Sequence, residues 1–326
     1  MLVAVDTETT GLSTWAGDRP FMVCYYAPEL GYVHKTAKIV NPLTRAVKWD
    51  TDDLYVLSRA LCDPSIEKVF HNAKFDIRML DSIGLKVQGK IHDTYYMAKA
   101  CYTNEPKYGL KPLAKKYLDI DDSDEKELKK AVQSARLKAK KFGYKLAESL
   151  EADYWLCPEL ALKYCKGDVN RCYLLMQFYF EGMKALDVRA AYDKEMELFP
   201  HVYDMEERGL RIDQAKIVEL NNEAVTKSEE IAVKFALEHK VVNINSHPEI
   251  RQLLEKHGLV NGKLTPGGLA STSSEALQHI DHQITKDIVT YRGYKKAGEY
   301  LLNYSDHAFP DTVLSVHDLV FKNYAI

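Results

Sequence analysis

The sequence lacks the features of a membrane-bound, secreted or disulfide-bonded protein. No apolar run reaches the length of a membrane span, and no basic stretch followed by an apolar core occurs near the N-terminus. The six cysteines form no C-x-x-C pair, which argues against a zinc site or a disulfide framework. The formal net charge of −3 gives no general attraction for nucleic acid. We therefore expect a cytoplasmic protein with reduced thiols, in which any DNA binding depends on a local basic patch.

An acidic pair follows the first apolar run of the chain. Leu2 to Val5 is rich in β-branched residues and predicts a buried strand. Asp6 and Glu8 come next, and strand residues two apart project to the same side. Two neighbouring carboxylates repel each other, and a divalent cation such as Mg²⁺ relieves that repulsion. The alternative is a strand end at the surface with two solvated acids.

Two further acids occur in helical contexts. Asp76 lies in the first turn of a helix that follows a short predicted strand at 68–71. Tyr164 and Asp168 are four residues apart on a helix predicted over about 160–180, so they share one helix face. Taken alone, Asp76 could merely compensate the helix dipole. Asp93 follows another short strand, and we interpret it as a structural cap of the next helix.

These acids stand in three strings that resemble the motifs of the DEDD 3′-5′ exonucleases, the superfamily of polymerase proofreading domains. The strings are DTETTGL at 6–12, NAKFD at 72–76 and YCKGD at 164–168. Because the third has the Y-x-x-x-D form, the chain resembles the DEDDy subgroup. The resemblance implies an α/β fold over residues 1–188, an RNase H-like exonuclease domain with a mixed central sheet flanked by helices.

The resemblance also implies a site for two divalent metal ions, Mg²⁺ or Mn²⁺. Asp6, Glu8, Asp76 and Asp168 would be the metal ligands, and Tyr164 would orient the attacking water. The residues that would contact the terminal nucleotides are Thr7 through its backbone, Leu12 as a wedge between bases, Asn72 and Phe75. Core packing is the alternative for Leu12 and Phe75.

A basic stretch in the helix predicted after residue 124 gives a further candidate contact with DNA. It includes Lys138, Lys140 and Lys141 in an otherwise acidic chain. Lysines that neutralise phosphates release counterions, which favours binding. A solvated helix face is the alternative.

Residues 189–326 resemble the linker and thumb of DNA polymerase I-like enzymes and predict a mostly α-helical second domain. The resemblance rests on MEERGLRID at 205–213, NINS at 243–246 and YR at 291–292. The palm motifs D-x-S-x-I-E and H-D-E are missing, since His317-Asp318 is followed by Leu319. In such enzymes the segment matching Thr312 to Ile326, which is apolar here, enters the palm. We therefore expect a separate polypeptide that carries the polymerase palm and fingers.

The sequence thus predicts a metal-dependent 3′-5′ exonuclease that removes 5′-mononucleotides from single-stranded or frayed DNA 3′ ends, as the proofreading part of a polymerase. Two alternatives remain open. One is RNase D-like trimming of RNA 3′ ends, against which the thumb-like half argues. The other is a DNA-holding or assembly subunit with an idle nuclease site, against which the complete set of acids argues.

Overall fold

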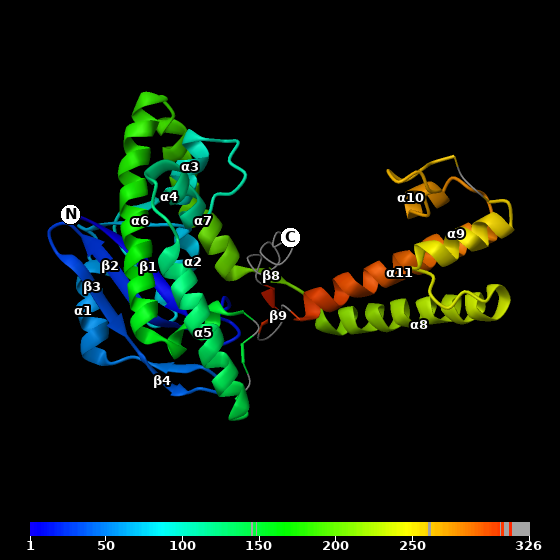
Figure 1. Cartoon of the computed structure of the whole chain (residues 1–326), viewed down its shortest axis with the longest axis horizontal. Coiled ribbons are helices and arrows are strands. Elements are labelled where there is room, and N and C mark those ends of the chain that lie inside the picture. Colours follow the sequence, from blue (N-terminus) through cyan, green and yellow to red (C-terminus); the bar gives the residue numbers. More distant parts are fainter. Residues whose placement is uncertain (145, 148, 260–261, 307, 310–312, 315–326) are drawn as a thin grey trace. The chain divides into compact units, whose positions relative to one another are not determined.

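The computed structural model describes residues 1–306 apart from 145, 148, 260 and 261, together with residues 308–309 and 313–314 (Figure 1). Contacts divide the chain into two compact units, Met1–Asp204 and Met205–Ile326. The predicted boundary after residue 188 falls at the start of α7 (Arg189–Arg208). Because Tyr192 and Phe199 of α7 are buried in the cores of the first unit, most of this helix packs with the first unit.

A five-stranded mixed sheet lies at the centre of the first unit (Figure 1). Its strands, in spatial order, are β3 (Gly31–Thr36), β2 (Pro20–Ala27), β1 (Leu2–Thr9), β6 (Glu67–Phe70) and β7 (Ile91–Asp93). The first three pair antiparallel, whereas β1, β6 and β7 run parallel. The carboxyl ends of these parallel strands therefore meet at one end of the sheet. The first acidic string begins within the end of β1, the second follows β6, and the third lies on a helix, α6 (Pro158–Ala185).

Helices cover both faces of this sheet. One face packs against α3 (Thr94–Cys101), α4 (Leu110–Leu118), α5 (Ser123–Lys141) and α6 (Pro158–Ala185). The opposite face packs against α1 (Thr51–Leu61) and α2 (Ala73–Asp81). The strand β1 supplies both cores, because Ala4 faces the α6 side while Val3 and Val5 face the other. This arrangement confirms the predicted α/β fold with a mixed sheet between helices.

Three smaller elements complete the first unit. The strands β4 (Lys38–Asn41) and β5 (Ala46–Lys48) form a separate antiparallel hairpin. A short 3-10 helix, η1 (Glu151–Leu156), joins α5 to α6. Its Tyr154 is buried, and its ring lies edge-on to that of Tyr164 with 5.5 Å between the ring centroids.

The second unit is mostly helical, as predicted. Its helices are α8 (Gln214–His239), α9 (His247–Lys256), α10 (Ser274–Leu277) and α11 (Gln283–Asp306), and α8 packs along α11 (Figure 1). A small core joins the four helices through residues such as Phe235, Leu254 and Ile288. Three two-residue strands, β8 (Leu210–Arg211), β9 (Ala308–Phe309) and β10 (Val313–Leu314), form a small sheet. Apart from β10, the segment Thr312 to Ile326 lies outside the described residues.

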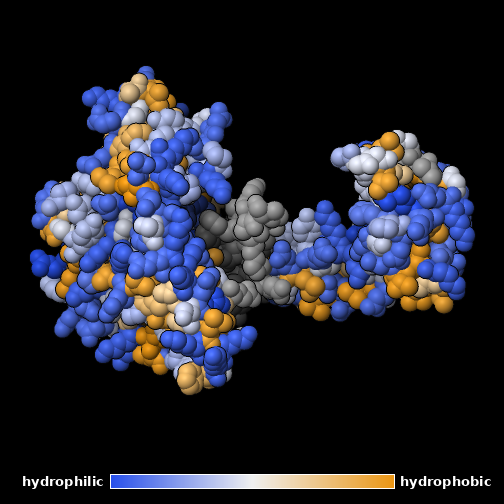
Figure 2. All heavy atoms as spheres, in the orientation of Figure 1, coloured by the Kyte–Doolittle hydropathy of each residue, from blue (hydrophilic) through white to orange (hydrophobic). Residues whose placement is uncertain are grey.

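The visible surface is largely hydrophilic, with scattered hydrophobic patches (Figure 2). Several apolar side chains on α8 are exposed, including Val218, Val233 and Leu237. Among the helices that the structure describes, none combines the length and the apolar character needed to cross a lipid bilayer.

Candidate active site

The two acids of β1 meet helix α6 at the carboxyl edge of the sheet. Asp6 and Glu8 lie on the same side of β1 as Ala4, which packs in the core that includes α6. On α6, Cys165 lies with its Sγ 3.4 Å from Oδ2 of Asp6. One donor atom from each of Asp6, Glu8 and Cys165 lies within 4.8 Å of the other two. The structure therefore brings the two carboxylates together, beside a thiol.

Glu8 is the most telling member of this group. Glu8 is only 7% exposed. Its Oε1 has no hydrogen-bond partner among the residues that the structure describes. Burial of a carboxylate oxygen without a partner is unfavourable. The orphaned oxygen therefore points to a cation as its missing partner.

Helix α6 carries Tyr164 and Asp168 one turn apart, and both are held by Lys111 of α4. The Nζ of Lys111 donates to the hydroxyl of Tyr164 at 2.7 Å and to Oδ2 of Asp168 at 2.6 Å. The other carboxylate oxygen of Asp168 accepts a bond from Arg171 at 3.0 Å. Arg171 is itself paired with Asp124 at 2.6 Å. The positively charged side chains of Lys111 and Arg171 thus compensate the charge of Asp168, and Lys111 also holds the phenol of Tyr164 in place.

Asp76 of α2 is held by the strand that carries the acidic pair. Its Oδ1 accepts bonds from the backbone N–H of Thr7 at 3.1 Å and from the Thr7 hydroxyl at 2.7 Å. Both donors of Thr7 are therefore engaged. The predicted backbone contact of Thr7 with a DNA terminus would have to use its carbonyl group or follow a shift of Asp76.

Asp93 anchors the helix on which Asp76 lies. Its carboxylate accepts bonds from the backbone N–H groups of Asn72, Ala73 and Tyr95 at 3.0, 2.8 and 2.9 Å. Asp93 caps α3, which confirms the structural role expected from the sequence. It also holds the start of α2, where Asn72 has a left-handed backbone with φ of 70°.

Burial raises the pKa of all four predicted metal-binding acids. The charges of Asp168 and Asp76 further raise the pKa of Asp6, and those of Asp6 and Asp168 raise the pKa of Glu8. Burial also raises the pKa of Asp76 to about 7, and it raises the pKa of Asp168. Acids coupled in this way take up either protons or a cation.

The donor set fits a hard divalent cation. Mg²⁺ and Mn²⁺ prefer carboxylate oxygens, and Asp6 and Glu8 offer such oxygens close together. The mutual influence on pKa places Asp76 and Asp168 in the same electrostatic environment. A bound cation would give Glu8 Oε1 a partner and relieve the repulsion among the acids.

The predicted substrate contacts near this centre differ in exposure. Leu12 is 67% exposed, so the core-packing alternative is wrong for this residue. Asn72 and Phe75 are partly exposed. The contacts of all these residues with DNA remain predictions.

The basic residues lie at the other end of α5 from its acidic start. Lys138, Lys140 and Lys141 are exposed in its last turns, and the following Phe142 is 82% exposed. The exposure suits a surface that contacts DNA and equally suits a solvated face.

Three residues of this centre were given no role from the sequence. Arg171 could have been found, because it lies three residues after Asp168 on the same helix. Cys165 directly follows Tyr164, but a thiol is not part of the resembled motif. The contact of Lys111 depends on how α4 packs against α6, for which the sequence carries no pairwise signal.

The comparison with known proteins now decides the family. Residues 1–178, more than half of the chain, match the 3′-5′ exonuclease family. The chain belongs to this family. The matched residues include Tyr164 and all four acids, and the resemblance inferred from the three strings is confirmed.

Relatives of this 3′-5′ exonuclease family member include DNA polymerases. DNA polymerase DpoZ of Salmonella phage PMBT28 is 31% identical over 300 residues, which cover 86% of this chain and 44% of the relative. DNA polymerase I of Chloroflexus aurantiacus is 27% identical over 332 residues, covering 95% of this chain and 31% of the relative. The chain thus spans less than half the length of these relatives.

A solved structure shows the same fold over nearly the whole exonuclease-family chain. The polymerase domain of Pol1 from M. smegmatis, in complex with DNA primer-template and dNTP, matches with a TM-score of 0.71 at 16% identity. The match covers 96% of this chain and 47% of that one. The likeness therefore includes the helical second unit.

The raised pKa values of the exonuclease acids predict how stability depends on pH and metal. Each acid keeps its proton to a higher pH in the folded protein than in the unfolded chain. The metal-free protein should therefore lose stability as pH rises from 3.8 to about 7, the range spanned by Asp76. Mg²⁺ needs deprotonated ligands, so its stabilising effect should grow over the same range.

Thermal unfolding in chelator and in Mg²⁺, followed at several pH values, measures both trends. Asp6→Asn is the control variant, because it should flatten the pH dependence of the metal-free protein. A melting temperature that rises with pH in chelator would contradict the prediction.

Proposed function

We propose that the chain hydrolyses DNA from the 3′ end and releases 5′-mononucleotides, as a DEDDy exonuclease with two divalent metal ions. The observation that carries the proposal is the pairing of Asp6 with Glu8 within reach of the charge of Asp168. Asp168 shares Lys111 with Tyr164, and the chain belongs to the 3′-5′ exonuclease family.

The four acids would divide between two ions. Asp6, Glu8 and Asp168 would hold one, and Asp6 and Asp76 would hold the second. When bound, such a pair supplies an activated water and neutralises charge on the leaving 3′-oxygen. Mg²⁺ or Mn²⁺ suits the oxygen ligands.

Tyr164 would orient the attacking water as a neutral phenol. Burial, together with the charges of Asp168 and Glu8, raises the pKa of Tyr164, so it keeps its proton and is no base. Because its oxygen accepts a bond from Lys111, its own proton remains available to donate. Lys111 thus positions the donor and compensates Asp168 at the same time.

The terminal nucleotides would lie over Thr7, Leu12, Asn72 and Phe75. Exposed Leu12 can wedge between bases, and the ring of Phe75 can stack on one. Stacking and backbone contacts tolerate any base, as removal of arbitrary 3′ nucleotides requires. We propose that this reaction takes place in the cytoplasm of a bacterial or phage-infected cell.

A labelled DNA strand tests the proposal directly. Time-resolved product analysis should show stepwise loss of mononucleotides from the 3′ end in Mg²⁺ and none in chelator. A matched RNA strand separates DNA degradation from RNase D-like trimming. Product formation that is unaffected by chelator would refute the metal-dependent mechanism, and binding of DNA without hydrolysis would favour an idle nuclease site.

A partner polypeptide with the polymerase palm and fingers is a further part of the proposal. It is supported by relatives that are named DNA polymerases and of which this chain spans less than half. Co-purification from the native source, followed by a gap-filling assay on primed DNA, tests it. Recovery of the chain alone would remove this part of the proposal.

The basic end of α5 yields a prediction about salt. Replacing Lys138, Lys140 and Lys141 by Gln should weaken DNA binding and flatten its dependence on salt. The plot of log affinity against log salt concentration has a negative slope, and each lost phosphate contact makes this slope less steep by about 0.7–0.9. Affinity measured across a salt series gives this slope.

A matched variant lies on the same helix. Lys126 and Lys129 pair with Asp122 and Glu125 near its start, so Lys126→Gln with Lys129→Gln should change the slope less. Equal slopes for the native chain and the triple variant would return the basic end to the solvated-face interpretation.

A further inference from the structure

The thiol of Cys165 lies where a metal ligand would lie. Its S–H points to Asp6, with Sγ 3.4 Å from Oδ2 and 3.9 Å from the backbone carbonyl oxygen. Its sulfur, one oxygen of Asp6 and one oxygen of Glu8 are mutually within 4.8 Å. Cys165 is fully buried, so helix packing fixes this position.

The distance between Sγ of Cys165 and Oδ2 of Asp6 suits two atoms that bind the same metal ion after the thiol has lost its proton. Zinc binds sulfur at about 2.3 Å and carboxylate oxygen at about 2.0–2.2 Å. At a tetrahedral angle these bonds separate the sulfur from the oxygen by about 3.6 Å. The observed separation of 3.4 Å is close to that value.

Glu8 supplies an independent reason to expect a ligand at this place. Its Oε1 is buried and has no hydrogen-bond partner within the described part of the chain. The same carboxylate supplies one oxygen to the group of three donors. A cation among them would satisfy Glu8 and share the charge of Asp6.

We propose that Cys165 acts with Asp6 and Glu8 as a third ligand for thiophilic divalent cations such as Cd²⁺ and Zn²⁺, which the thiol selects over Mg²⁺. Thiolate favours such ions, whereas Mg²⁺ favours oxygen ligands alone. On binding, the thiol proton passes to solvent. The inference rests on the proposed metal site and adds its selectivity: these ions occupy the Asp6–Glu8 pair and compete with Mg²⁺.

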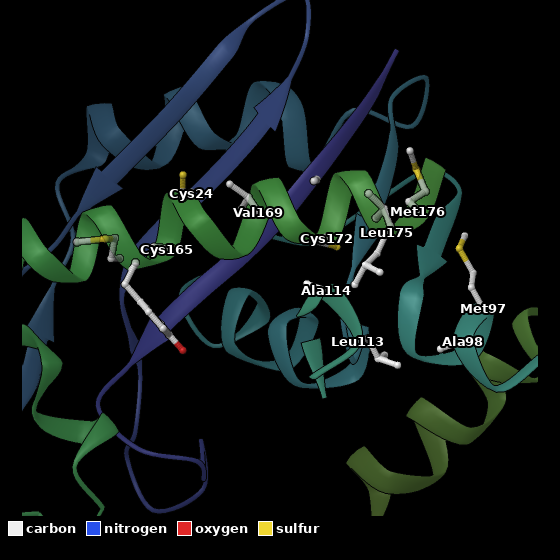
Figure 3. Close-up of a cluster of buried hydrophobic side chains, with 14 of the residues drawn as sticks. Cys24, Met97, Ala98, Leu113, Ala114, Cys165, Val169, Cys172, Leu175 and Met176 are labelled. Carbon is white, nitrogen blue, oxygen red and sulfur yellow. The ribbon is translucent and has the colours of Figure 1, made fainter. Parts of the chain in front are cut away.

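Two other cysteines of the same core serve as comparisons. Cys172 is also buried and lies two turns further along α6, but its Sγ is 3.9 Å from the Thr94 hydroxyl and it is not part of the three-donor group. Figure 3 shows Cys165, Val169 and Cys172 in succession along this helix. Cys24 lies opposite Asp6 in the β1–β2 ladder, which makes it the stricter control.

Titration of the whole chain with Cd²⁺ alone, without DNA or Mg²⁺, tests the inference. We expect an ultraviolet charge-transfer band of a cadmium–thiolate bond that saturates at one ion per chain. Cys165→Ala and Cys165→Ser should abolish this band and weaken Cd²⁺ binding at least 10-fold, since loss of even an outer partner of a metal ligand costs about 10–100-fold. Mg²⁺ binding should change less than Cd²⁺ binding.

The controls separate the possible outcomes. Cys172→Ala and Cys24→Ala should retain the band and the Cd²⁺ affinity, with circular dichroism to check the fold of every variant. A band that survives both Cys165 variants, or that follows Cys24, would overturn the inference. Because the band is read without DNA, it can appear in a chain that fails to degrade DNA. Binding of Cd²⁺ by Cys165 is therefore tested independently of whether the chain degrades DNA.

Discussion

Asp6→Asn should lower the rate of DNA 3′-end hydrolysis by about 10³-fold. Asp6 is the acid proposed to contact both ions, and charge stabilisation by bound metal is worth several kcal/mol, of which about 4 kcal/mol corresponds to this factor. The same change should raise the melting temperature of the metal-free protein. It removes a carboxylate whose charged form is disfavoured, because burial and the charges of Asp168 and Asp76 raise the pKa of Asp6.

The opposite signs of these two effects make the test specific. Loss of activity through misfolding would lower the melting temperature as well. Asp153→Asn is a matched control, because Asp153 is a buried acid that pairs with Arg136 instead of with the acids of the site. It should cost stability and leave most of the activity. Full activity of Asp6→Asn in single-turnover kinetics would exclude the proposed metal site.

Tyr164→Phe should slow single-turnover hydrolysis by about 10- to 1000-fold, the scale of losing one positioned donor. Its metal affinity should be nearly unchanged, because the phenol is not among the proposed metal ligands. Lys111 would lose one acceptor but keep its bond to Asp168. Rapid-quench kinetics at saturating metal, with isothermal titration of Mn²⁺, separates the two quantities.

The neighbouring tyrosine provides the control for this variant. Tyr154 lies edge-on to Tyr164, and its buried hydroxyl finds no partner among the described residues. Tyr154→Phe should therefore leave hydrolysis within a few-fold and should not destabilise the protein. An unchanged rate in Tyr164→Phe would reduce Tyr164 to a packing residue.

Local periodicity was enough to predict much of the site. The two-residue period of a strand placed Asp6 beside Glu8, and the four-residue spacing placed Tyr164 and Asp168 on one helix face. The helix predicted at about 160–180 extends over Pro158–Ala185. Asp93 was correctly interpreted as a cap because capping depends on a few neighbouring residues.

Contacts between distant elements could not be predicted in this way. The bond of Lys111 to Asp168 joins α4 to α6, and the bonds of Thr7 to Asp76 join β1 to α2. Each depends on the register and depth of packing, which no local pattern encodes. The hairpin of β4 and β5 was missed for another reason: strands of four and three residues carry too little alternation to be recognised.

The bonds of Lys111 and Arg171 to Asp168 have a consequence for how the protein is made. The ammonium group of Lys111 and the guanidinium group of Arg171 belong to the chain itself and are in place before any metal binds. A newly synthesised chain can therefore close its acidic centre without waiting for a metal ion. Removal of the metal should abolish hydrolysis while the protein stays folded. Addition of metal should then restore hydrolysis without refolding.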